Sequence, residues 1–193
     1  MIRIATEKDI PAILAIYGPY VEDTTVSFEY TVPTAESFLE RFRTITAQFP
    51  WLVWEEDGRV LGYAYGSPPY ARAAYGWCAE PSVYLAPDAH RRGIGTALYA
   101  ALEKILALQG YHVLYALVTS ENEVSMGFHE KNGYRIRAEF PECAYKFGRV
   151  LGVTWLEKRL SPVEIPSTQP VSWLSIVSND QKLTDILDSL SLS

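Results

Sequence analysis

The sequence lacks the long apolar segments that mark membrane-spanning and secreted proteins. Its longest apolar runs are far shorter than the roughly 20 residues that a helix needs to span a bilayer. Residues 1–6, Met-Ile-Arg-Ile-Ala-Thr, do not carry the apolar stretch of a secretory signal. We therefore expect a cytoplasmic protein that has no membrane partner.

Positive charge is scarce, and so are residues spaced to bind a metal. The chain has 17 Lys and Arg against 23 Asp and Glu, a net charge of −6, which argues against a nucleic-acid partner. The two cysteines and three histidines have no zinc-site spacing, so no metal is expected. Cys78 and Cys143 are expected to be reduced thiols, although the sequence alone leaves a disulfide open.

Apolar residues are plentiful and regularly spaced. They make up 48% of the 193 residues, which suffices for the core of one compact domain. Their spacing predicts the order β-α-α-β-β-β-α-β-α-β-β, a mixed α/β fold. The clearest elements are a hairpin over residues 51–65 that turns at Asp57-Gly58, and a long helix that begins near Ile94 and ends at Gly110.

The remaining elements have weaker signals. A first helix is expected to follow the capping residue Thr6 and to be interrupted at Gly18-Pro19, with a loop over residues 21–30. A second helix is expected between Thr34 and Pro50. Further strands are predicted at residues 2–5, 82–85, 113–118, 134–140 and 150–160, and a short helix at residues 121–130.

The composition changes after Leu160, so we divide the chain into a domain over residues 1–160 and a tail over residues 161–193. Residues 161–170 are rich in Pro, Ser and Thr, as linkers are. Leu183, Ile186, Leu187 and Leu190 predict a last amphipathic helix. That helix either packs on the domain's own surface or docks on a second subunit.

The most informative stretch is the loop between strand 82–85 and the long helix. It contains the run His90-Arg91-Arg92-Gly93-Ile94-Gly95. A helix start offers free backbone N–H groups and a positive dipole end, and glycine lets an anion approach the backbone closely. The run therefore predicts a pyrophosphate site. The alternative is an ordinary glycine-containing turn with solvated arginines.

Two familiar phosphate-binding motifs do not fit this loop. A P-loop requires a Lys directly after its last Gly, and Thr96 follows Gly95 here. A dinucleotide fingerprint requires a third Gly or Ala where this chain has Leu98, and no acidic residue ends a strand about 20 residues later.

The loop resembles the acetyl-CoA motif of GNAT acetyltransferases, [QR]-x-x-G-x-[GA], with His90 in place of the first Gln or Arg. Other segments are similar to the phosphinothricin and methionine sulfoximine N-acetyltransferase branch of that family, and the resemblance spans roughly residues 1–160. These segments are Ala64-Tyr65, Arg72, Tyr75, Trp77, Glu80 to Tyr84, Asn122, Ser125, His129 to Tyr134 and Tyr145 to Arg149.

The resemblance implies the GNAT acyl-CoA N-acyltransferase fold, a central mixed, mostly antiparallel sheet flanked by helices, and acetyl-CoA as cosubstrate. Backbone groups of the strand would bind the pantetheine arm and the loop would bind the pyrophosphate. The implied cofactor-binding residues are Val83, Tyr84, Leu85, Arg91, Arg92, Gly93, Ile94, Gly95, Thr96, Asn122 and Lys131. Asn122 is also placed to cap a helix.

The resemblance further implies that a neutral amine attacks the thioester, which requires a base. Glu80 is the first candidate, because burial near Trp77, Tyr75 and Tyr84 would raise its pKa; the alternative is a surface glutamate. His129 is the second candidate, or else a structural histidine. The amide of Leu85 would face the developing oxyanion.

The substrate would carry a carboxylate, which Arg72 would bind unless it is a solvated loop arginine. The other implied substrate-binding residues are Phe28, Glu29, Ala73, Ala74, Tyr75 and Asn132. Cys78 is interpreted as a packing residue.

The expected function is therefore acetyl transfer to the α-amino group of a small amino acid analogue such as L-phosphinothricin, methionine sulfoximine or methionine sulfone. One alternative is a GNAT enzyme for a polyamine or a protein N-terminus, although Arg72 argues against an acidic polyamine pocket. The other is an acetyl-CoA-binding module without catalysis. Enzymes of this branch are commonly homodimers, and the aromatic-rich sequence fits that expectation.

Overall fold

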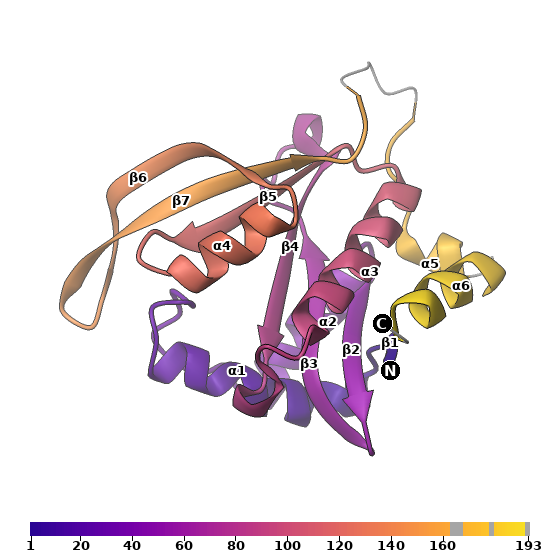
Figure 1. The fold of residues 1–193 in the computed structure, drawn as a ribbon, viewed down its shortest axis with the longest axis horizontal. Helices are drawn as coiled ribbons and strands as arrows, with labels where there is room; N and C mark the ends of the chain where they lie inside the picture. The colour runs from indigo at the N-terminus through magenta and orange to yellow at the C-terminus, as the bar shows by residue number, and fades with distance from the viewer. Residues whose placement is uncertain (163–167, 178–179, 192–193) are drawn as a thin grey trace.

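The computed structural model describes residues 1–162, 168–177 and 180–191. Within them, a seven-stranded sheet has the order β1-β2-β3-β4-β5-β7-β6 (Figure 1). Strand neighbours pair antiparallel except β4 and β5, which are parallel. The predicted mixed, mostly antiparallel α/β fold is confirmed.

The N-terminal half of the sheet follows the sequence pattern closely. Strand β1 (Ile2–Ile4) pairs with β2 (Trp51–Glu56), which pairs in turn with β3 (Arg59–Ser67). The turn between β2 and β3 has φ of 50° at Asp57 and 76° at Gly58, as the predicted hairpin requires.

Helix α1 (Ile10–Glu22) is longer than its sequence predicts, because it continues through Gly18-Pro19. A proline removes one N–H from the helix but does not end it where packing holds both sides. Tyr17 before Pro19 and Val21 after it are both buried. The predicted interruption is therefore wrong, and the loop begins only after Glu22.

Two helical layers cover the sheet. Helix α2 (Ala35–Thr46) begins at the predicted cap, where Thr34 accepts a hydrogen bond from the amide of Ser37 at 3.2 Å. Its buried Phe38 and Phe42 pack on Trp51, on the face that α1 also covers. Helix α3 (Ile94–Gln109) lies on the opposite face and ends at Gly110, whose φ is 95°.

The two central strands diverge, and this divergence positions the candidate site. Strand β4 (Cys78–Leu85) pairs with β3 from Glu80 to Leu85. Its register with β5 (Val113–Thr119) is Cys78↔Val113 and Ala79↔Leu114, at the start of both strands. Beyond that point β5 runs toward β7 and leaves β4, as Figure 1 shows.

The last strands form a hairpin that is longer than predicted. After α4 (Glu123–Lys131), β6 (Arg135–Lys146) pairs with β7 (Arg149–Arg159). The sequence pattern ends at Phe140 because β6 is exposed on nearly its whole length, and its register shifts between Phe140 and Ala144. Such a bulge interrupts the alternation that identifies a strand. The hairpin projects past α4 to one side of the molecule (Figure 1).

The tail returns to the domain. Helices α5 (Trp173–Val177) and α6 (Asp180–Ser191) pack on α3, and α6 also contacts β1. Leu183 is buried there, so the predicted helix packs on its own chain. Residues 163–167 of the predicted linker lie outside the described residues, and the boundary at residue 160 stays a prediction. No helix in the described ranges has the length and apolarity to cross a bilayer.

Candidate active site

Beyond Ala79, the edge of β4 that faces β5 is not paired with that strand. The amide of Ala86 donates to Leu61 of β3 at 2.9 Å. Because backbone groups alternate along a strand, those of Val83 and Leu85 point away from β3 and toward the opening, while those of Tyr84 point toward β3. At Leu85 both groups contact the Tyr20 hydroxyl, the carbonyl at 2.8 Å and the amide at 3.4 Å. An extended amide-containing ligand can therefore add to this edge at Val83 as another strand would, and at Leu85 where it displaces Tyr20.

The opening leads to the start of α3. Arg91 has φ of 59° and Gly93 has φ of 81°, so the backbone curls immediately before the helix. The amides of the first turn, over Ile94, Gly95 and Thr96, have no partner within the helix. A Cβ at Gly95 would lie 3.3 Å from the Leu85 side chain, which explains a glycine where β4 and α3 meet closely. Arg92 forms an exposed ion pair with Glu56 at 2.6 Å.

Tyr20 is a residue of this region that sequence analysis missed. Its hydroxyl donates to the Leu85 carbonyl at 2.8 Å and lies 3.2 Å from Nε2 of His90. His90, which stands where the family motif has Gln or Arg, therefore contacts Tyr20 of α1, and Tyr20 contacts Leu85 of β4. An aromatic residue three positions after Tyr17 was the available signal in the sequence.

Glu80 lies on β4 on the face covered by α1 and α2. The register pairs Ser67 with Glu80, Tyr65 with Ser82 and Tyr63 with Tyr84, so these side chains share that face. Burial raises the pKa of Glu80 to about 7. The carboxyl group is therefore suited to exchange a proton at neutral pH.

His129 lies on the opposite face, buried in α4 beside Tyr99 and Tyr134. Its Nδ1 is 2.8 Å from the Ser125 carbonyl, and its Nε2 is 2.9 Å from the Tyr99 hydroxyl. Burial lowers the pKa of the imidazole. Both ring nitrogens thus have partners in the structure, an arrangement that suits a structural histidine.

The loop between α1 and α2 brings Phe28 and Glu29 to the Glu80 face. Glu29 forms an ion pair with Arg41 at 2.6 Å. Burial raises the pKa of Tyr84, and the charges of Glu80 and Glu29 raise it further. Glu80 of β4 and Glu29 of the loop therefore both lie near Tyr84. Phe28, which precedes Glu29 in the chain, is exposed.

The segment before β4 lies at the surface. Arg72, Ala73, Ala74 and Tyr75 are all exposed, and residues Ala73–Tyr75 form a short 3-10 helix. Tyr75 packs on Tyr70 with ring centroids 4.4 Å apart. Both rings line a cavity of about 460 Å³ that also contains the half-buried Cys78. Burial raises the pKa of the Cys78 thiol, which does not favour a nucleophile.

The remaining predicted site residues lie at the two ends of α4. Asn122 accepts a hydrogen bond from the Ser125 amide at 3.0 Å and so caps the helix, next to the end of β5. Asn132 donates to the Phe128 carbonyl at 2.7 Å, and Lys131 beside it is exposed. At 1.5 Å per residue, the nine-residue helix separates the two ends by about 13 Å.

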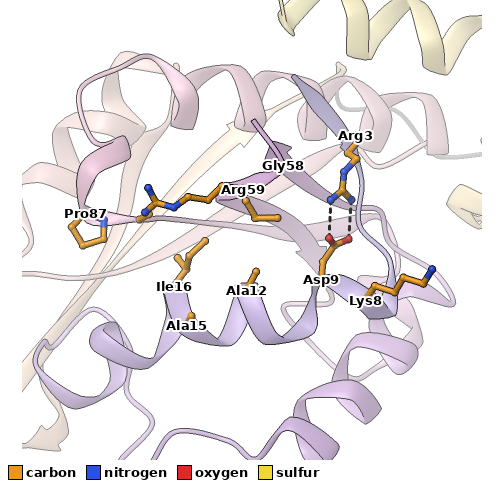
Figure 2. Close-up of a pocket in the computed structure, with 11 residues that line it drawn as sticks. Arg3, Lys8, Asp9, Ala12, Ala15, Ile16, Gly58, Arg59 and Pro87 are labelled. Atoms are coloured by element: carbon orange, nitrogen blue, oxygen red, sulfur yellow. Dashed lines mark hydrogen bonds and ion pairs between the residues drawn. The ribbon is translucent and has the colours of Figure 1, made fainter. Parts of the chain in front are cut away.

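A second cavity, of about 470 Å³, lies between α1, the β2–β3 turn and Pro87 (Figure 2). Its Arg3 pairs with Asp9 at 2.7 Å, and its Arg59 pairs with Asp88 at 2.6 Å. None of the predicted site residues lines this cavity. Its arginine charges are balanced by carboxylates, and we assign it no catalytic role.

The sequence and the structure are similar to known acetyltransferases. The family model described as acetyltransferase (GNAT) domain matches residues 2–168. The phosphinothricin N-acetyltransferase of Streptomyces viridochromogenes is 35% identical over 147 residues, 76% of this chain and 80% of that protein. The L-methionine sulfoximine/L-methionine sulfone acetyltransferase of Pseudomonas aeruginosa is 36% identical over 165 residues, 83% of this chain and 95% of that protein.

Among solved structures, the phosphinothricin acetyltransferase from Sinorhizobium meliloti in complex with acetyl-CoA superposes with a TM-score of 0.82. It is 31% identical, and the match covers 89% of this chain and 92% of that one. The fold and the sequence thus agree in what they resemble.

Proposed function

The chain belongs to the GNAT acetyltransferase family, and on this premise we propose that it acetylates the α-amino group of a small amino acid analogue. L-phosphinothricin, methionine sulfoximine and methionine sulfone are the proposed acceptors. The observation that carries the proposal is the Glu80 carboxyl, whose pKa is about 7, on the strand that leads to the start of α3.

The cosubstrate of this family, acetyl-CoA, supplies an acetyl thioester. We propose that the backbone edge at Val83 and Leu85 binds its amide-containing arm, with the Tyr84 side chain beside it. The amides from Gly93 to Thr96, with Arg91 and Arg92, would bind its diphosphate. Asn122 and Lys131 are proposed as further contacts. The outward-pointing backbone groups of Val83 and the curled loop before α3 support this assignment.

Glu80 is the proposed base. The acceptor's ammonium group must lose a proton before its nitrogen attacks a thioester, and a carboxylate with a pKa of about 7 accepts that proton directly or through one water. His129 remains the second proposed candidate. Its two hydrogen bonds favour Glu80, because a base needs an available lone pair.

The acceptor is proposed to lie between the α1–α2 loop and β4. Phe28 and Glu29 would border it on one side, and Arg72 would pair with its carboxylate. Exposure of Arg72 leaves its guanidinium available for such a pair. Ala73, Ala74, Tyr75 and Asn132 are proposed as further contacts.

We also propose that the enzyme is a cytoplasmic homodimer. Large apolar side chains are exposed on the α1–α2 loop and on the β6–β7 hairpin, and subunit interfaces are enriched in aromatic residues. These side chains are Val26, Phe28, Tyr30, Phe140, Tyr145, Phe147 and Val150.

A thiol-release assay with acetyl-CoA tests the proposal across a panel of amino acids, their sulfoximine and phosphinate analogues, and polyamines. We expect release of CoA with the α-amino acids. Activity confined to polyamines would refute the acceptor class. Binding of acetyl-CoA without turnover on any amine would instead indicate a module that has lost catalysis.

A further inference from the structure

Lys146, the last residue of β6, is a buried cation held by backbone carbonyls. Lys146 is only 3% exposed. Its Nζ donates to the carbonyls of Val21 at 2.7 Å, Thr24 at 2.8 Å and Ser27 at 2.6 Å. An ammonium group has three donors, and all three are used. Among the described residues no carboxylate forms an ion pair with it.

The three acceptors all belong to one short stretch of chain. Val21 lies in the last turn of α1, where carbonyls lack helical partners and the helix dipole is negative. Thr24 and Ser27 follow in the loop that connects α1 to α2. A cation at their centre compensates three convergent carbonyl dipoles, which would otherwise repel one another and lose their solvation. The conformation of this loop therefore depends on a residue that is 119 to 125 positions away.

The tip of the hairpin is built to deliver this ammonium group. Phe147 and Gly148 have φ of 53° and 70°, so they form a tight two-residue turn directly after Lys146. The neighbouring Tyr145 carbonyl accepts a hydrogen bond from the Tyr30 hydroxyl at 2.6 Å. On the other side of the turn, Arg149 pairs with Glu121, which also accepts a hydrogen bond from Thr25.

The same loop is bound to the Glu80 face by its side chains. The Ser27 hydroxyl lies 2.7 Å from the Tyr17 hydroxyl and accepts a hydrogen bond from the Glu29 amide at 3.2 Å. Tyr17 packs edge-on against Tyr84, with ring centroids 5.1 Å apart. Lys146 thus binds the carbonyl of Ser27. The hydroxyl of the same Ser27 links the Glu29 amide to Tyr17, which packs on Tyr84.

We propose that Lys146 is a positioning residue for the acceptor amino acid: its ammonium group holds residues 24–30 so that Phe28 and Glu29 border the proposed acceptor site between the α1–α2 loop and β4. This inference rests on the proposed function of that site. It adds a residue at the tip of the β6–β7 hairpin whose three ammonium donors are all used by backbone carbonyls of the loop. The three hydrogen bonds of the Lys146 ammonium group go to residues 21, 24 and 27 and none goes to the start of α3, so we expect acetyl-CoA binding to change much less than acceptor binding.

The test compares wild type with Lys146→Met, which keeps the length and apolar stem of the side chain but removes the ammonium group. Lys104→Met on α3 is the matched control, because Lys104 is exposed and its replacement changes the net charge equally. We expect the KM for the acceptor to rise about tenfold or more in Lys146→Met, since each charge-assisted hydrogen bond contributes about a tenfold factor. The KM for acetyl-CoA stays within about twofold.

Hydrogen exchange gives a second measurement that does not require turnover. We expect the amides of residues 24–30 to exchange about tenfold faster in Lys146→Met, with those of α3 unchanged. An unchanged acceptor KM in an active enzyme, or equal effects on both substrates, overturns the inference. A wild type that acetylates no amino acid refutes the proposed function, and the exchange result alone then decides whether Lys146 holds the loop.

Tyr30→Phe keeps the inference testable if Lys146→Met does not fold. This change removes an exposed hydrogen bond between the loop and the same hairpin tip. We expect a rise of about two- to threefold in the acceptor KM, in the same direction and without an effect on acetyl-CoA. Unchanged acceptor KM and unchanged exchange of residues 24–30 in Tyr30→Phe would contradict the inference.

Discussion

The hydroxyl of Tyr99 lies 2.9 Å from Nε2 of His129, and together with Ser125 it determines which nitrogen of the ring is protonated. The Ser125 carbonyl, 2.8 Å from Nδ1, only accepts a hydrogen bond. Nδ1 therefore carries the proton, and Nε2 faces the Tyr99 hydroxyl, which also has the Pro81 carbonyl as an acceptor at 3.1 Å. The Nε2 lone pair that a general base needs is buried against this hydroxyl, which leaves Glu80 as the better-placed group.

Removing the Tyr99 hydroxyl tests this interpretation. Tyr99→Phe removes the hydroxyl from both Nε2 of the buried histidine and the Pro81 carbonyl, so we expect the free energy of unfolding to fall by about 1–2 kcal/mol. We expect kcat/KM for the acceptor to change by less than about threefold. Urea unfolding and steady-state rates give the two values, and a rate loss as large as that of a Glu80 variant would transfer the proton-accepting role to His129.

The pH dependence of the rate should report the ionisation of Glu80. A base must be deprotonated to act, so kcat/KM for the acceptor is expected to rise with pH and to level off above about 7, the pKa that burial gives Glu80. Glu80→Gln should lower kcat by about 10²- to 10⁴-fold and remove this ionisation from the profile. Calorimetry should find acetyl-CoA affinity unchanged in that variant; a profile that keeps its limb near pH 7 would contradict the assignment.

The same carboxyl group should make stability depend on pH. Its folded pKa of about 7 lies above the ordinary value of 4.5, so the folded state binds more protons between these values. Its contribution to stability is present below pH 4.5 and is lost as the pH rises through 7. Glu80→Gln should therefore be more stable than wild type at pH 8, by on the order of 3 kcal/mol, with little difference at pH 4.5. Thermal melts at the two pH values check the sign.

The curled backbone before α3 yields a prediction for Gly93. Its φ of 81° suits glycine, and an added Cβ would meet no atom within 4 Å. Gly93→Ala should therefore cost about 1 kcal/mol from backbone strain alone. Because relief of that strain displaces the amides of the first turn, we expect the Kd for acetyl-CoA to rise several-fold while the acceptor KM changes little. Gly127→Ala, in α4 with equally open surroundings, is the control for loss of a glycine.

Local signals predicted most of the fold, and long-range contacts explain the misses. Asp57-Gly58, Thr34 and Gly110 mark their turn and helix ends by chemistry that a few neighbouring residues decide. Pro19 breaks a helix by the same local rules, yet packing of Tyr17 and Val21 keeps α1 continuous. The end of β6 has no apolar alternation to identify it. Its pairing with β7, and not its own sequence pattern, makes it a strand.

The site divides in the same way. The glycine-containing loop before α3 was predicted from the chemistry of a few neighbouring residues, whereas Glu80 was predicted from the family resemblance and its expected burial. Lys146 was noted only as part of a resemblance, since a lysine that ends a strand looks solvated until its carbonyl partners, more than a hundred residues earlier, are known. The partners of Tyr20 and Tyr99 were hidden for the same reason.

The divergence of β4 and β5 divides the sheet into two parts, β1-β2-β3-β4 and β5-β7-β6. The two parts pair at Cys78↔Val113 and Ala79↔Leu114. A molecule bound between the diverging ends of β4 and β5 would contact both parts of the sheet and connect them. Occupancy should therefore stiffen the enzyme as a whole, and the melting temperature should climb with acetyl-CoA concentration. A saturating ligand would then also lower the fraction of unfolded, protease-sensitive chain.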